Sequence, residues 1–163
     1  MGGSVTPSEF RAAITPLVAA AHRLKSPDPI ARVVARVEKK VAACQSNANT
    51  RAKKAGIEGR LSLDDVRQAF LLDYGRECPF TGERMRYTNT ELDHVAPFRI
   101  GGENAGHNIR LLSARANKIK EGMTDSAAHI LFDALMQMDA ESAASATRRL
   151  AVAPAWKRWT PKG

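Results

Sequence analysis

The feature that most restricts the fold of this chain is a helical period in its apolar residues between positions 30 and 41. The apolar set is Ile30, Val33, Val34, Val37 and Val41, and the basic residues Arg32, Arg36, Lys39 and Lys40 fall mostly between its members. Spacings of three and four place the first set on one side of a helix and the second on the other. The segment predicts an amphipathic helix that frays over residues 45–50, because Asn47 and Asn49 are poor helix formers.

Capping patterns predict helices on both sides of this one. Thr6 can cap a helix that runs to about residue 24. Ser62 and Asp65 form a capping-box pattern that opens another helix, which Gly75 closes. We therefore expect residues 1–77 to form a helical and basic region.

The end of the chain is also helical in pattern. Thr124 can cap a helix Thr124–Met138, and the Ala- and Ser-rich stretch Ala140–Ala151 predicts a second helix. The expected buried stripe of the first is Ile130, Leu131, Leu135 and Met138. We expect residues 125–163 to consist of these helices and a basic tail from Trp156, packed on the centre of the chain.

Charge limits the classes of partner. The 163 residues carry a formal net charge of +8, with basic residues concentrated between Arg32 and Arg60. Such an excess favours polyanions, because each Lys or Arg placed on a phosphate releases condensed counterions. A solvated helix face explains the pattern equally well, and charge does not separate DNA, RNA and an anionic membrane. Two cysteines and no long apolar run favour a cytoplasmic protein over a disulfide scaffold or a membrane protein.

The pattern changes over residues 78–124, where short apolar runs alternate with turn residues. Thr90–Val95 and Ile109–Leu112 are strand candidates, joined by a loop that contains a Gly-Gly pair. Ser113 can then cap a short helix. The sequence therefore predicts an α+β fold, in which a small hairpin-helix core is embedded in a mainly α-helical chain.

Polar residues gather at one end of this predicted core. Asn117 and Lys120 are three apart and share a helix face, which can lie against the strand end that carries Asp93 and His94. Neighbouring strand residues point to opposite sides, so both serve one site only if the chain bends at His94. Taken singly, Asp93 as a turn cap and His94 as a partly buried structural histidine are the commoner interpretations.

The order and spacing of these residues resemble the HNH nuclease motif. The matching segment runs from about Cys78 to Thr124, less than a third of the chain, and contains His94, Asn108 and Asn117 in order. This family of ββα-metal modules includes homing endonucleases, phage nucleases and bacterial DNase toxins. The resemblance implies a metal-dependent phosphodiester hydrolase.

The resemblance also implies a role for each matching residue. His94 matches the general base that takes a proton from the attacking water, and Asn108 matches the residue that holds the loop and orients that base. Asp93 and Asn117 match the metal ligands. A carboxylate and an amide oxygen suit Mg²⁺, for which Mn²⁺ or another divalent ion can substitute.

Basic residues supply the predicted contacts to DNA phosphates. They are Lys120, Arg115, Arg99 and Arg110 close to the motif, and Lys53 and Lys54 in the N-terminal region. Solvated surface charge is the alternative for each of them. Contacts of this kind position a nuclease without conferring sequence preference.

Many members of the family brace the module with a zinc ion held by two Cys-x-x-Cys pairs. The corresponding positions here are Cys78, Thr81, Ser113 and Ala116. One thiolate cannot build a tetrahedral site, so no structural zinc is predicted. The expected brace is apolar packing of Phe80, Leu92, Val95, Leu111, Leu112 and Ile119.

The leading hypothesis is a Mg²⁺-dependent endonuclease or nickase of double-stranded DNA, with residues 78–124 as the nuclease core and residues 1–77 gripping the duplex. Two alternatives stay open: a non-catalytic DNA-binding or assembly module with an HNH fold, and an RNase. We expect a prokaryotic or phage-encoded protein without a membrane partner. The sequence does not indicate an oligomeric state.

Overall fold

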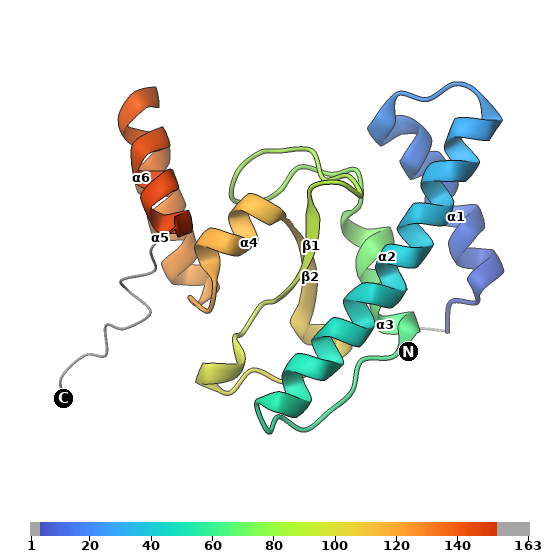
Figure 1. Ribbon diagram of the computed structural model, residues 1–163, viewed down its shortest axis with the longest axis horizontal. Coiled ribbons are helices and arrows are strands. Elements are labelled where there is room, and N and C mark those ends of the chain that lie inside the picture. The colour runs from blue at the N-terminus through green and yellow to red at the C-terminus, as the bar shows by residue number, and fades with distance from the viewer. Residues whose placement is uncertain (1–3, 153–163) are drawn as a thin grey trace.

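A two-stranded hairpin lies at the centre of the chain, with helices on both sides of it (Figure 1). The computed structural model describes residues 4–152, so the basic tail expected from Trp156 lies outside them. The elements are α1 (Pro7–His22), α2 (Pro27–Lys54), α3 (Leu63–Asp73), β1 (Thr90–His94), β2 (Ile109–Ser113), α4 (Ala114–Lys120), α5 (Asp125–Met136) and α6 (Ala140–Val152). The chain is 62% helical, which confirms the predicted α+β class.

The hairpin is antiparallel, and its register is set by the pairing of Thr90 with Ser113 and of His94 with Ile109. Leu92 and Leu111 pair across it and are both buried. Helices α2 and α3 pack against one side of the hairpin and α4 against the other (Figure 1). This arrangement buries β1 and β2 between two helical layers.

The apolar core joins the N-terminal helices to the hairpin. Its largest fully buried apolar side chains are Phe10, Ile14, Leu61, Phe70, Tyr74, Met85, Leu111, Leu112 and Ile119. Of the residues predicted to brace the hairpin, Val95 is only partly buried and the other five are buried. The capping boxes at Thr6 and Ser62 are both formed, as the sequence predicted.

Helix α2 does not fray where its asparagines predicted. It continues without a break to Lys54, because tertiary contacts outweigh the low helix propensity of residues 45–50. Gln45 and Asn49 both donate side-chain hydrogen bonds to the carbonyl of Leu61, at 2.9 and 3.0 Å. Ala48, between them on the helix, is fully buried.

Helix α5 begins after its predicted cap, Thr124, and buries part of the predicted stripe. Leu135 is buried and Leu131 partly buried, whereas Ile130 and Met138 are exposed. Its buried residues are Ala128, Phe132 and Leu135, and Ile130 is 72% exposed. The correction follows from Phe132, which stacks on Phe80 with ring centroids 5.0 Å apart. This aromatic contact turns the 128–132–135 stripe inward. No helix in the described part of the chain has both the length and the apolar character needed to cross a membrane.

Candidate active site

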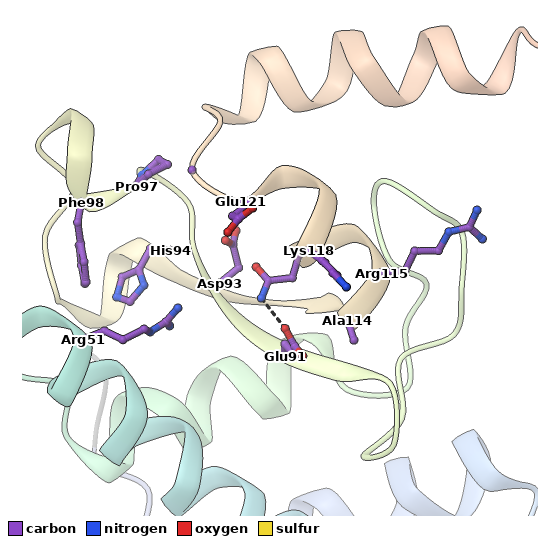
Figure 2. A pocket seen from close by; sticks show the side chains of 12 residues that line it. Arg51, Glu91, Asp93, His94, Pro97, Phe98, Ala114, Arg115, Lys118 and Glu121 are labelled. Atoms are coloured by element: carbon purple, nitrogen blue, oxygen red, sulfur yellow. Dashed lines mark hydrogen bonds between the residues drawn. The ribbon is translucent and has the colours of Figure 1, made fainter. Parts of the chain in front are cut away.

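A cavity of about 730 Å³ opens beside the hairpin, between β1, α4 and the C-terminal half of α2 (Figure 2). Its lining includes Arg51, Glu91, Asp93, His94, Phe98 and Asn117. The structure thus brings together the predicted base and both predicted metal ligands. It adds a glutamate and an arginine that the sequence did not single out.

Strand β1 supplies Glu91 and Asp93, which share a face because strand side chains alternate. The Oδ2 atom of Asp93 lies 2.9 Å from Nζ of Lys120 and 3.4 Å from Nε of Arg110. Within the described residues, Oδ1 of Asp93 has no comparable partner. One oxygen of this carboxylate is therefore held by cations and the other is available to a ligand.

Helix α4 presents Asn117 to the same face of β1. Its Nδ2 donates to Oε2 of Glu91 at 2.7 Å, the dashed line in Figure 2. That bond directs the amide nitrogen toward Glu91, and Oδ1 accepts no hydrogen bond from the described part of the chain. The cavity thus contains carboxylate oxygens of Asp93 and Glu91 and an uncommitted amide oxygen of Asn117.

This donor set fits a hard divalent cation such as Mg²⁺, which prefers oxygen ligands and retains several waters. Among the described residues, no three His, Cys, Asp or Glu side chains cluster closely enough to hold a metal by themselves. An ion between Asp93 and Asn117 would therefore leave most of its coordination positions to water or to a phosphate. Open positions of this kind are what a catalytic metal needs.

His94 ends strand β1 and is 7% exposed. Its ring packs on Phe98, with centroids 4.3 Å apart and an interplanar angle of 52°. Its Nε2 lies 3.1 Å from Oδ1 of Asn104. Because the strand ends here, Asp93 and His94 line one cavity although they are adjacent in sequence.

The surroundings of His94 favour the neutral imidazole. Burial lowers its pKa below the ordinary value of 6.5, and the positive charges of Arg51 and Lys120 act in the same direction. The hydrogen bond to Asn104 and the charge of Asp93 oppose this shift without cancelling it. A neutral imidazole at pH 7 is the form that accepts a proton.

Asn108 holds the loop that follows His94. Its Oδ1 accepts from the Ala96 amide at 2.8 Å, and its Nδ2 donates to the carbonyls of Ala96 and Glu103 at 3.0 and 2.8 Å. A Cβ on Gly102 would lie 1.8 Å from the Ala96 oxygen, so the loop is too tight there for any side chain. The predicted loop role fits these bonds, but Asn104, not Asn108, contacts the imidazole of His94.

Two predicted phosphate contacts are corrected by the structure. Lys120 is fully buried and donates to the carbonyls of His94 and Val95, at 2.9 and 3.2 Å, as well as pairing with Asp93. Arg110 lies over the ring of Phe80 and forms a two-pronged ion pair with Asp125, at 2.6 and 2.7 Å. Both cations stabilise the hairpin internally, so neither is free to bind DNA.

The other predicted phosphate contacts are exposed. Arg115 lines the cavity. Arg99 is close to it and donates to the carbonyl of Gly122 at 2.6 Å. Lys53 and Lys54 lie at the C-terminal end of α2, outside the lining of this cavity. Their role stays a prediction.

Sequence reasoning missed Arg51, Glu91 and Asn104. Glu91 carried a usable signal, since it lies two positions before Asp93 on the same strand face. Arg51 comes from a helix more than 40 positions from His94, and Asn104 was one polar residue in an irregular loop. Neither had a local pattern that indicated the cavity.

The four positions that correspond to zinc ligands in relatives of the motif lie together. The Ser113 amide donates to Sγ of Cys78 at 3.4 Å, and the hydroxyls of Thr81 and Ser113 are 3.0 Å apart. Ser113 also caps α4 by accepting from the Ala116 amide at 3.2 Å. Direct hydrogen bonds thus connect this corner, and the absence of a structural zinc stays a prediction.

No protein-family model, curated protein sequence or solved structure matches the chain. The HNH resemblance therefore depends on the motif residues and on the geometry described above. The structure itself shows a mainly helical α+β protein with a polar cavity built on a hairpin and the helix that follows it.

Proposed function

We propose that this protein is a metal-dependent endonuclease or nickase that hydrolyses DNA phosphodiester bonds. The observation that carries the proposal is the convergence of His94, Asp93 and Asn117 on one cavity. A buried imidazole with a lowered pKa faces the same space as uncommitted carboxylate and amide oxygens. Perturbed titratable groups in a cavity are typical of catalytic sites.

In this mechanism His94 is the general base. It takes a proton from the water that attacks phosphorus, which its neutral form at pH 7 allows. Asp93 and Asn117 would hold a divalent cation, Mg²⁺ or Mn²⁺. When bound, that ion supplies positive charge for the scissile phosphate and for the leaving oxygen. The expected products carry a 5′-phosphate and a 3′-hydroxyl.

Arg51 is the residue best placed to bind the substrate phosphate. Figure 2 shows it beside His94 at the edge of the cavity. Its guanidinium has no hydrogen-bond or ion-pair partner among the described residues. A planar guanidinium matches two phosphate oxygens at once, so Arg51 would fix the phosphate in front of the base.

A second cavity of about 520 Å³ extends the first along helix α2. The two share Arg51, Glu91 and Asn117, and the second continues past Asn47 to Lys40. We place the strand that leads to the scissile bond in this groove, with α2 as its basic wall. Lys53 and Lys54 would then contact phosphates farther along the DNA.

A plasmid assay tests this function. Supercoiled DNA is incubated with wild type, His94→Ala and His107→Ala, each with Mg²⁺, Mn²⁺ or EDTA. His107 is the matched control, because it is exposed in the same loop region and does not line the cavity. We expect nicked or linear DNA from wild type and His107→Ala with metal, and none from His94→Ala or with EDTA.

Other outcomes would overturn the proposal. Equal cutting by wild type and His94→Ala would exclude His94 as the base. Binding of the plasmid without cutting under any condition would indicate a DNA-binding module. Cleavage of a labelled RNA in preference to DNA would indicate an RNase.

A further inference from the structure

A chain of side-chain amides connects His94 to the backbone of a distant loop. Asn104, which is 1% exposed, lies between His94 and Asn49 of helix α2. Asn49 in turn forms two hydrogen bonds with the backbone of Leu61, one to its amide and one to its carbonyl. The connection joins the proposed base to residues outside the HNH-like segment.

The backbone amide of Leu61 determines which atom donates and which accepts in each hydrogen bond of this series of amides. The amide nitrogen of Leu61 can only donate, so the atom of Asn49 that faces it at 2.9 Å must be the oxygen. The same oxygen lies 2.8 Å from Asn104 and can only accept there as well. The Asn104 atom that faces Asn49 is therefore its NH₂ group.

A second backbone group gives the same orientation. The carbonyl of Gly59, which can only accept, lies 3.3 Å from the same NH₂ group of Asn104. The amide oxygen of Asn104 therefore faces His94, where Nε2 lies 3.1 Å away. An amide oxygen cannot donate, so Nε2 must carry the proton of the neutral ring.

We propose that Asn49 and Asn104 are positioning residues that fix His94 as the Nε2–H tautomer and leave Nδ1 as the basic nitrogen. Neither residue touches the reacting atoms, and both act through His94. One consequence rests on the proposed function: in a nuclease, Nδ1 would be the atom that takes the proton from water. The tautomer itself is a property of the folded chain without substrate or metal.

Nitrogen-15 NMR of the full chain tests the tautomer directly. At about pH 8 the imidazole is neutral, and long-range proton–nitrogen correlations identify which ring nitrogen of His94 is protonated. We expect Nδ1 at the unprotonated position and a slowly exchanging Nε2–H signal. A protonated Nδ1 in wild type would overturn the proposal without any variant.

Substitutions at Asn104 test the cause. Asn104→Leu removes the acceptor and should abolish the protected Nε2–H signal. Asn104→Asp keeps an acceptor for Nε2–H but loses the NH₂ group that donates to Asn49 and Gly59, so it should retain the signal in part. Glu103→Leu is the control, because it places a leucine at the exposed neighbouring position of the same loop, outside the lining of both cavities. An unchanged Nε2–H signal in a folded Asn104→Leu protein would refute the positioning role of Asn104.

Activity assays separate this proposal from the proposed function. If the protein is a nuclease, Asn104→Leu should lower kcat more than 10-fold with little change in KM, and Asn104→Asp should recover part of the loss. If the Nε2–H tautomer is fixed in a protein that cuts no DNA, the positioning role of Asn49 and Asn104 stands and the proposed nuclease function is overturned. Full activity of a folded Asn104→Leu protein would overturn the positioning role of Asn104 and leave the proposed nuclease function standing.

Discussion

Replacing Lys120 by Met should destabilise the fold strongly, although the two side chains are similar in length. The amine of Lys120 is fully buried and contacts four oxygens: the carbonyls of His94 and Val95 and the carboxylates of Asp93 and Asp125. Methionine fills the space but donates no hydrogen bond. The substitution leaves Asp93 with Arg110 as its remaining cation, at 3.4 Å.

The magnitude follows from the cost of a buried charge that loses its partner, which is about 3–5 kcal/mol. The two carbonyls that lose a donor contribute to the same range and are not added separately, since interactions in one network are not additive. A domain is stable by about 5–15 kcal/mol in total. Lys120→Met should therefore remove a large share of the free energy of unfolding.

Urea unfolding followed by far-UV circular dichroism measures this loss. Lys118→Met is the matched control, because Lys118 is exposed on the same helix, and it should change stability by no more than about 0.5 kcal/mol. Adding Asp93→Asn to Lys120→Met should restore part of the stability by removing a buried carboxylate that has lost its nearer cation and keeps only Arg110. A cost below about 1 kcal/mol for Lys120→Met would refute the reasoning.

Three further predictions concern the site and its loop. The pKa of His94 is lower in the folded than in the unfolded chain, so the unfolded chain takes up the proton first as pH falls. The stability from the neutral ring is therefore present above pH 6.5 and is lost as pH falls from 6.5 through the folded pKa. The acidic limb of kcat/KM should likewise lie below pH 6.5, and a limb above it would contradict the assigned shift. Asn117→Ala should weaken Mn²⁺ binding in calorimetry at least 10-fold, whereas Asn47→Ala, an exposed asparagine outside the lining of the first cavity, should leave it unchanged. Gly102→Ala should lower the unfolding midpoint in urea, because its Cβ would lie 1.8 Å from the Ala96 oxygen; a midpoint equal to wild type would show that the loop relaxes freely.

The local parts of the fold could be predicted from the sequence. Caps at Thr6, Ser62 and Thr124 and the strands around Asp93 have signatures within a few residues. Such signatures reflect backbone groups that must find a partner nearby. For the same reason, the register of Asn117 on its short helix was correctly anticipated.

The rest depended on contacts between distant segments. Lys120 was predicted to contact a DNA phosphate, and only the fold brings four protein oxygens around its amine. The continuous helix through Asn49 required Leu61 as a partner. The face buried by α5 required Phe80 and Phe132 to meet. Sequence periodicity does not contain this information.

The anchoring of Asn104 on Asn49 has a consequence for how the proposed nuclease site could be divided or moved to another protein. A fragment that begins at Cys78 would contain the whole motif yet lose Asn49, Arg51 and the Leu61 backbone. Its Asn104 would lose its hydrogen bonds to Asn49 and Gly59, so the orientation of the amide that faces His94 would no longer be fixed. The proposed phosphate site would also lack the guanidinium of Arg51. The smallest segment that keeps the proposed site intact therefore includes helix α2. A graft of the hairpin and α4 alone onto another protein would transfer the proposed metal ligands without fixing the tautomer of His94.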